Sequence, residues 1–291
     1  MNSSSQSLKD YLIFIFLCIT WGSSFILIKK GLIAFDPVEV AILRIGITAL
    51  AFIPIYALMV KGRFPLHKMK YAVLAGLLGN GIPAFLYAIA QTHVESSVAG
   101  ILNSLTPIFV WVIGLLFFAT HFRITQLAGV VIGFLGAAAI VLLNHRFQFR
   151  LDSFTLLIVL ATVCYGLSAN VVKTYLQDVN AIALSAMALF IIGIPAIAYS
   201  FFTDIYTSVV SESAARLSLL ALIILALVGT ALANILFYRL IQKTSAVFAS
   251  SVAYLIPVTA LGWGLLDGEA LAAIHLLGMG LILVGVWLLR R

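Results

Sequence analysis

Ten long apolar runs, separated mostly by connections of a few residues, constrain the fold of this 291-residue chain more than any other feature. A helix needs about 20 apolar residues to cross the hydrocarbon core of a bilayer, where only helices and closed barrels satisfy their own backbone polar groups. The sequence therefore predicts an all-α membrane protein with ten transmembrane helices. The runs cover residues 11–32, 38–60, 70–91, 96–119, 124–143, 154–175, 181–202, 217–241, 245–266 and 270–289.

The composition excludes a soluble enzyme domain. Hydrophobic residues make up 63% of the chain and charged residues only 9%, with a mean hydropathy of +1.18, whereas soluble domains carry about 25% charged residues. The net charge of +7 could indicate a nucleic-acid partner, but the basic residues are scattered in short connections, which indicates membrane topology. We therefore expect the lipid bilayer and a small-molecule substrate as partners, and no nucleic acid.

The distribution of lysine and arginine predicts the orientation. Cytoplasmic connections of membrane proteins carry an excess of these residues. The side that holds both termini is richer, so we expect both termini in the cytoplasm. The short connections and the lack of targeting signals favour the inner membrane of a bacterium. That side carries Lys9, Lys61, Arg63, Lys68, Lys70, Arg123, Lys173, Arg239, Lys243, Arg290 and Arg291, and the other carries Lys29, Lys30, Arg146, Arg150 and Arg216.

The chain also repeats itself after half its length. An offset of 150 residues maps Gly79 onto Gly229 and Pro107 onto Pro257, and Trp21-Gly22 is echoed by Tyr165-Gly166. Each half contains five predicted helices, an odd number, so the second half must enter the membrane in the opposite orientation. The sequence thus predicts two inverted five-helix repeats, residues 1–145 and 152–291, the architecture of alternating-access carriers with a site near the bilayer midplane.

These features resemble the drug/metabolite transporter superfamily, and within it the ten-helix EamA-like exporters. The resemblance lies in Trp21-Gly22-Ser23-Ser24-Phe25, in Arg44 early in the second run and in Pro107 in the fourth. The second half ends similarly, with Tyr254 to Pro257, Gly268-Glu269, Gly278 and Gly285.

The resemblance implies export of amino acids or other small metabolites through a central cavity. The family's Gly-Glu pair after the ninth helix is present, but Ala119 stands at the glutamate position after the fourth. A role for that acid in the first half is therefore in doubt. The family is broad in cargo, so the resemblance indicates a class of protein and leaves the solute open.

Polar and aromatic side chains follow one face of two equivalent predicted helices. Asn80 and Tyr87 share a face of the 70–91 helix, and Asn234 and Tyr238 lie at the equivalent phase of the 217–241 helix. Such faces suit a cavity that binds a small polar solute; the alternative is hydrogen bonding between helices. The predicted substrate-binding residues are Trp21, Ser24, Asn80, Tyr87, Asn103, Tyr165, Asn234, Tyr238 and Tyr254.

Two prolines are predicted to kink their helices. Pro107 and Pro257 each remove a backbone donor and open the hydrogen-bond ladder about one turn earlier. Freed carbonyls at membrane depth are tolerated only against protein or water, so we expect kinks that face the cavity. A kink that only shapes packing is the alternative.

Three of the basic residues within the predicted spans are candidates for gating or charge recognition. Lys29 and Lys173 lie late in their helices, where lysine commonly extends to the interface; the alternative is a gate that meets a substrate carboxylate. Arg44 is deeper, where a charge costs about 2.5–3.5 kcal/mol at the helix centre. It therefore needs a partner, and Asp36 or Glu39 could supply an ion pair.

Acidic residues are missing from the middle of every predicted span. Proton-coupled carriers usually hold a titratable group inside the membrane, and His275 is the only histidine well within a run. The sequence therefore favours facilitated diffusion or exchange over proton coupling. No Cys/His cluster has metal-ligand spacing, so we expect neither metal nor cofactor.

The glycine spacings Gly129-x-x-x-Gly133 and Gly278-x-Gly280 to Gly285 indicate close helix contacts. They could lie within the chain or in a homodimer, so we expect a monomer or a homodimer.

The sequence therefore predicts an exporter of small metabolites, with amino acids first, that works by alternating access. Nucleosides, cofactors and drugs are alternative cargoes. A membrane enzyme acting on lipids is disfavoured because the chain contains neither Gly-x-Ser-x-Gly nor His-Glu-x-x-His.

Overall fold

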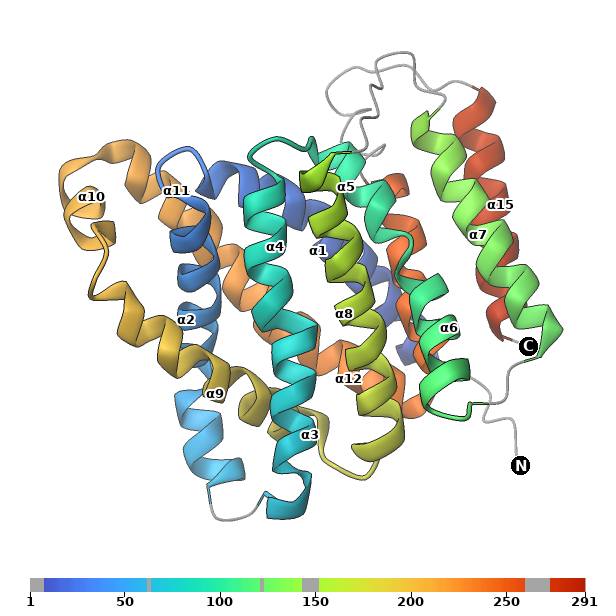
Figure 1. Cartoon of the computed structure of the whole chain (residues 1–291), viewed down its shortest axis with the longest axis horizontal. Helices are drawn as coiled ribbons and strands as arrows, with labels where there is room; N and C mark the ends of the chain where they lie inside the picture. Colours follow the sequence, from blue (N-terminus) through green and yellow to red (C-terminus); the bar gives the residue numbers. More distant parts are fainter. Residues whose placement is uncertain (1–7, 62–63, 121–122, 143–151, 260–272, 291) are drawn as a thin grey trace.

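The computed structural model describes residues 8–61, 64–120, 123–142, 152–259 and 273–290. These residues form helices and connections, and none of them lies in a strand (Figure 1). Seven helical segments in this part of the chain are long and apolar enough to cross a membrane. They are Leu8–Gly31, Pro37–Val60, Leu66–Ala90, Val98–Phe117, Ser153–Tyr175, Ala181–Ser200 and Ser213–Lys243.

These segments confirm a helical membrane protein. They match seven of the ten predicted runs to within a few residues. Shorter apolar helices, Ile124–Ala139, Ala246–Thr259 and Leu276–Leu289, coincide with the other three runs. Each of the three runs extends into residues outside the described part of the chain, so the count of ten spans stays a prediction. The connection 203–216 contains helix α10 (Ile205–Ser211), and the next helix begins at Ser213.

Several predicted spans are built from more than one helical segment. The uninterrupted helices are α1 (Leu8–Gly31), α7 (Ile124–Leu142), α8 (Ser153–Tyr175), α9 (Ala181–Ser200) and α15 (Ala273–Arg290). In the others, α2 (Pro37–Ile55) continues as a π-helix (Tyr56–Val60), and α3 (Leu66–Gly76) and α4 (Ile82–Ala90) are joined by a π-helix (Leu77–Gly81). A break separates α5 (Ser96–Asn103) from α6 (Thr106–Phe117). A π-helix (Leu225–Leu232) joins α11 (Ser213–Ile224) to α12 (Ala233–Lys243), and a 3-10 helix (Ser251–Leu255) follows α13 (Ala246–Ser250).

The local sequence explains where several helices begin. Asp36 and Glu39 form a reciprocal capping box at the start of α2, with Pro37 in the first turn. Asp152 and Thr155 form the same arrangement at the start of α8. The side chain of Asn180 accepts two backbone N–H groups at the start of α9.

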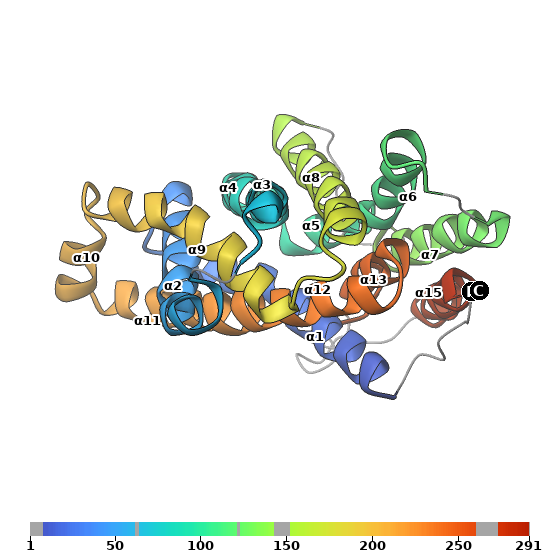
Figure 2. The same ribbon diagram turned by 90° about the horizontal axis from the view of Figure 1, so that it is seen from below.

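The helices of the two halves pack in equivalent pairs. Helix α2 packs along α9, and α7 lies beside α15 at one edge of the molecule (Figures 1 and 2). Helix α1 packs on α11 and α12 of the second half, while α8 packs on α3 and α4 of the first. Each half therefore contributes one long helix to the other half's broken span.

Glycines permit the close contact between α7 and α15. A Cβ added at Gly129 would lie 2.8 Å from the carbonyl oxygen of Gly285, and one at Gly136 would lie 2.7 Å from that of Gly278. The predicted glycine contacts thus occur within the chain, as small residues allow close approach of membrane helices. Gly280 differs, because a Cβ there would meet nothing within 4 Å.

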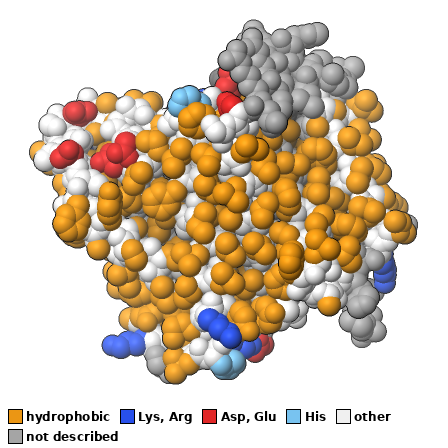
Figure 3. Space-filling view, viewed as in Figure 1, with side chains coloured by type: hydrophobic (Ala, Val, Ile, Leu, Met, Phe, Trp, Pro, Cys, Tyr) orange, Lys and Arg blue, Asp and Glu red, His pale blue; other side chains and the backbone are white. Residues whose placement is uncertain are grey.

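The surface has the banded pattern of a membrane protein. Figure 3 shows a hydrophobic belt between two rims, with acidic side chains mainly on the upper rim and lysine or arginine on the lower. The connection between α8 and α9 lies at this lower end (Figure 1). There Lys68 and Asp178 form an ion pair, and the ammonium group lowers the pKa of the Asp178 carboxyl.

Ala119 offers a test of local strain at the end of α6. It is the one non-glycine described residue with positive φ, 49°, and it lies where the last turn of a helix commonly takes a left-handed glycine. We expect Ala119→Gly to raise the unfolding free energy by about 1 kcal/mol, because the left-handed conformation penalises a Cβ. Thermal unfolding of the purified protein in detergent measures the effect.

The matched control is Ala214→Gly in α11, where the backbone is helical and the side chain is exposed. Glycine gains nothing at such a position and lowers stability slightly. An Ala119→Gly protein no more stable than the wild type would contradict the assignment of strain.

Candidate functional site

A cavity of about 810 Å³, including the space at its mouth, lies where the broken spans of the two halves meet α1, α2 and α8. Sites for small molecules commonly lie between the helices of a bundle. The lining residues are Trp21, Ser24, Phe25, Ile28, Arg44, Gly79, Asn80, Tyr87, Asn103, Thr106, Tyr165, Ser168, Gly229, Asn234, Phe237, Tyr238, Ser250, Ala253 and Ile256.

The structure brings most of the predicted site residues together around this cavity. Eight of the nine predicted substrate-binding residues line it, as does Arg44. Tyr254 does not: its hydroxyl donates to the carbonyl oxygen of Val130 at 2.8 Å, and its ring packs against Gly133. It therefore serves the contact with α7.

Two π-helices supply the irregular backbone at the cavity wall. Gly79 and Asn80 lie in the Leu77–Gly81 segment, and Gly229 lies in the Leu225–Leu232 segment. The hydroxyl of Thr230 donates to the carbonyl oxygen of Leu225, five residues earlier, at 3.1 Å. Wide turns of this kind occur frequently at functional sites, and here the same irregularity occurs once in each half.

A serine approaches each of these glycines from the opposite half. A Cβ on Gly79 would lie 2.7 Å from Oγ of Ser168, and one on Gly229 would lie 3.2 Å from Oγ of Ser24. The indole Nε1 of Trp21 also donates to the carbonyl oxygen of Gly229 at 3.0 Å. The glycines therefore let helices α1 and α8 reach the π-helices closely.

Two asparagines bridge the halves. Nδ2 of Asn80 donates to Oδ1 of Asn234 at 3.1 Å, and Nδ2 of Asn234 donates to Oδ1 of Asn80 at 2.7 Å. Nδ2 of Asn234 also donates to the carbonyl oxygen of Thr230 at 2.8 Å. The sequence analysis gave cavity lining and interhelical hydrogen bonding as alternative roles for these amides. In the structure they do both.

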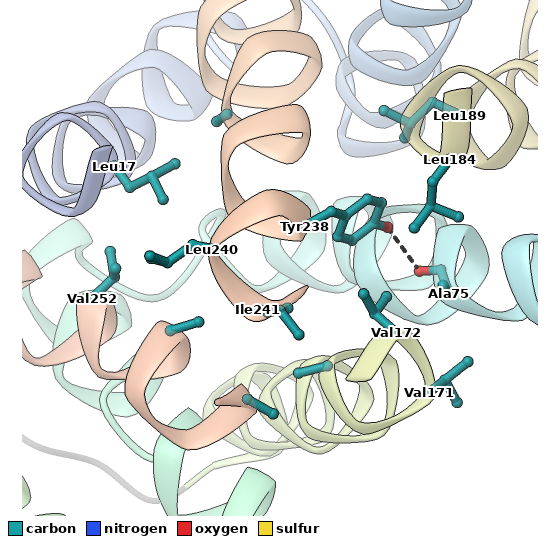
Figure 4. Packing of buried hydrophobic residues seen from close by; sticks show 14 of the residues in the cluster. Leu17, Ala75, Val171, Val172, Leu184, Leu189, Tyr238, Leu240, Ile241 and Val252 are labelled. Carbon is teal, nitrogen blue, oxygen red and sulfur yellow. Dashed lines mark hydrogen bonds between the residues drawn. The ribbon is translucent and has the colours of Figure 1, made fainter. Parts of the chain in front are cut away.

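A buried tyrosine packs near this bridge. The hydroxyl of Tyr238 donates to the carbonyl oxygen of Ala75 at 3.5 Å, and Oγ of Ser168 donates to the same oxygen at 2.9 Å. Figure 4 shows the Tyr238 side chain pointing from α12 toward Ala75, among apolar residues that include Leu184, Val172 and Ile241. This region is closed by packing, since Tyr238 is only 1% exposed.

Aromatic rings form another part of the wall. The hydroxyl of Tyr87 donates to Oδ1 of Asn103 at 2.7 Å. The Tyr87 ring lies 6.1 Å from the ring of Tyr165 and 5.6 Å from that of Phe25. The Trp21 ring makes an edge contact with Phe237 at 4.9 Å. An apolar portion of a solute could stack on these surfaces.

Arg44 brings a cation to the cavity without a carboxylate partner in the described chain. Its Nε donates to Oγ1 of Thr230 at 2.9 Å. Asp36 and Glu39, the predicted partners, instead bind each other's backbone in the capping box of α2. The ion pair that the sequence offered for Arg44 is therefore not formed.

The two candidate gate lysines lie away from the cavity. Lys29 is exposed. Nζ of Lys173 donates to the carbonyl oxygens of Thr244 at 2.6 Å and Gln242 at 3.3 Å, at the end of α12. Lys173 thus satisfies carbonyl groups that the helix end leaves free.

Each predicted kink follows an interruption of the α-helix. Pro107 lies in the first turn of α6, just after the break that follows Asn103, and Pro257 comes just after the 3-10 helix Ser251–Leu255. Oγ of Ser104 donates to the carbonyl oxygen of Ala253 at 3.1 Å, so the two interruptions contact each other. Thr106 and Ala253, which flank them, line the cavity. The side chain of His275, the predicted candidate for proton coupling, lies outside the described residues.

Sequence reasoning did not select several lining residues. Ser168 stands two residues after Gly166, as Ser24 stands two residues after Gly22, so the sequence repeat could have identified it as a lining residue. The 150-residue offset pairs Gly79 with Gly229, so the repeat could have identified these two glycines as well. Ile28 and Ile256 carried no such signal in the sequence, because apolar residues occupy every face of these helices.

Comparison with known proteins agrees with this architecture. Over 280 residues the chain is 28% identical to the "uncharacterized inner membrane transporter YedA" of Escherichia coli strain K12, covering 93% of this chain and 87% of that protein. It is 22% identical to a "probable amino-acid metabolite efflux pump" of Salmonella typhimurium, covering 97% and 95%. A solved crystal structure shares the fold with a TM-score of 0.73 at 17% identity, covering 97% of this chain and 96% of the other.

The family comparison covers nearly the whole chain. The model of the EamA-like transporter family matches twice, at residues 8–142 and 153–291. These two matches take in every helix that lines the cavity. The chain therefore belongs to the EamA-like transporter family and is a multi-pass membrane transporter.

Proposed function

We propose that the protein exports small amphipathic metabolites, amino acids foremost, across the inner membrane of a bacterium. The observation that carries the proposal is a single cavity, lined by both halves, that combines aromatic surfaces with amide, hydroxyl and guanidinium groups. Such a lining can hydrogen-bond the polar part of a solute and stack on its apolar part. The name of the Salmonella relative points to the same class of cargo.

The proposed mechanism is alternating access by two inverted repeats, residues 1–145 and 152–291. Equivalent contacts support it: α1 packs on α11 and α12 as α8 packs on α3 and α4. Ser24 approaches Gly229 as Ser168 approaches Gly79. Rocking of one repeat against the other around a fixed site is the general mode of such carriers.

We assign the Asn80–Asn234 bridge to the closed side of the cavity. The bridge joins the two halves, and the sealed packing around Tyr238 lies close to it. The basic lower rim in Figure 3 would face the cytoplasm, with both termini on that side. Opening the cavity to the cytoplasm would then require the two amides to separate.

The first prediction concerns transport itself. Proteoliposomes holding the purified protein should take up labelled amino acids from a mixed pool in a saturable manner. A pH gradient should not drive this uptake, because the described cavity residues include no carboxylate or histidine. Uptake driven by the pH gradient would contradict facilitated transport. If no amino acid were taken up, the assignment of amino acids as the cargo would be contradicted, and nucleosides, cofactors or drugs would be tested next.

The second prediction concerns the amide bridge. Asn80→Leu or Asn234→Leu should each reduce uptake per folded molecule. Each should also lower the free energy of unfolding by about 1–3 kcal/mol, because the remaining buried amide loses its hydrogen-bond partner. The free energy of unfolding of the double variant should be about 0.6–1.7 kcal/mol higher than the sum of the two single effects predicts. Its uptake should still be low.

Asn170→Leu is the matched control. Asn170 is buried and its Nδ2 donates to the carbonyl oxygens of Val110 and Gly166, but it does not line the cavity. This variant should lose stability while retaining uptake per folded molecule. Wild-type uptake in both bridge variants would refute the assignment.

A further inference from the structure

The guanidinium group of Arg44 brings free hydrogen-bond donors to the cavity. Thr230 engages only Nε of Arg44, so neither Nη nitrogen has a protein partner among the described residues. The ionisable groups that act electrostatically on Arg44 there are Tyr87 and Tyr165, and neither ring carries charge near neutral pH. A cation held within the membrane is stabilised by a counter-charge, and this part of the chain supplies none.

Other unengaged groups in the cavity wall can also donate. Thr106 is 6% exposed, and its Oγ1 is buried without a hydrogen-bond partner in the structure. Asn103 uses its Oδ1 to accept from Tyr87, while its Nδ2 has no partner among the described residues. The hydroxyl of Tyr165 is likewise without a described hydrogen bond. Tyr87 contacts both Asn103 and Tyr165, so these two residues lie near each other in the wall.

The side-chain amide oxygens of the cavity, in contrast, are already occupied. Oδ1 of Asn80 and Oδ1 of Asn234 accept from each other's amide nitrogens, and Oδ1 of Asn103 accepts from Tyr87. The described lining contains no aspartate or glutamate. An ammonium group entering this cavity would therefore meet no carboxylate there.

We propose that the site recognises a carboxylate and does not require an amino group. The carboxylate would bind the Nη nitrogens of Arg44, a pairing whose fork geometry is favourable, with Asn103 and Thr106 as further donors. The hydrocarbon part would lie against Trp21, Phe25 and Phe237. This inference rests on the proposed transport of small amphipathic solutes, and it narrows that class to monocarboxylates, of which amino acids are one kind.

A matched set of four compounds tests the inference by binding. Leucine carries both groups, 4-methylpentanoate lacks the amine, leucinamide lacks the carboxylate charge and 3-methylbutylamine lacks the carboxylate. Each is titrated against the purified protein in detergent, and the rise in unfolding temperature gives an apparent Kd. We expect leucine and 4-methylpentanoate to bind with similar apparent Kd, and the two compounds without a carboxylate to bind at least about tenfold more weakly.

Variants connect the preference to its residues. Arg44→Gln should weaken 4-methylpentanoate binding at least about tenfold, whereas Arg44→Lys, which keeps the charge, should retain part of it. Thr106→Val should weaken it to a smaller extent. Arg216→Gln is the control, because Arg216 is exposed on α11 and its Nη1 donates to the carbonyl oxygens of Val209 and Val210, away from the cavity. Size-exclusion elution and unfolding without ligand show whether each variant is folded.

The outcomes separate this inference from the proposed function. Equal binding of 3-methylbutylamine and 4-methylpentanoate, wild-type affinity in Arg44→Gln, or no binding of either carboxylate would overturn the inference. Uptake of labelled leucine into proteoliposomes is measured in parallel. Leucine uptake that does not depend on Arg44 would leave the transport proposal standing, whereas Arg44-dependent binding without uptake would support the anion site and overturn the proposed transport of leucine.

Discussion

The absence of water from the hydrocarbon core governs this structure, because every backbone polar group at that depth needs a partner inside the protein. Long helices provide those partners automatically, and α1, α8 and α9 are uninterrupted for that reason. The interruptions occur where other groups compensate. The hydroxyl of Thr230 serves the π-helix in the second half, and Ser104 bonds a carbonyl of the 3-10 helix. The irregular backbone of these two segments therefore lies at the cavity.

The same constraint explains why polar side chains concentrate at one site. Asn80, Asn234 and Arg44 would each be costly against lipid. In the structure the amides satisfy each other across the two halves, and Thr230 contacts Arg44. A hydrogen bond that joins the halves stabilises one arrangement of them, and it must break if the halves rock. Because such bonds contribute only about 0.6 kcal/mol on average in membrane proteins, a polar bridge can hold a conformation without locking it.

The fold was largely predictable from the sequence because hydropathy directly reports burial in lipid. The seven long spans begin and end within a few residues of the predicted runs. Side-chain pairing was less predictable. The helical period placed Asn80 and Asn234 on cavity faces, but their mutual hydrogen bonds depend on π-helices that shift the register. Tyr254 does not line the cavity, because its face turns toward α7. Asp36 and Glu39 were expected to pair with Arg44 because they are close to it in the sequence. In the structure both side chains cap helix α2 instead.

The contrast between Lys173 and Arg44 shows how charge can be sorted into structural and functional roles. Lys173 lies near a helix end, and its ammonium group meets two carbonyl oxygens that the end of α12 leaves free. These carbonyl oxygens therefore stabilise its charge within the protein. Arg44 lies deeper, and the described residues offer it one hydroxyl and two neutral phenols. A protein that needed Arg44 only for packing could replace it with an apolar residue at lower cost. The energetic cost of keeping it is best explained if the missing counter-charge arrives with the solute.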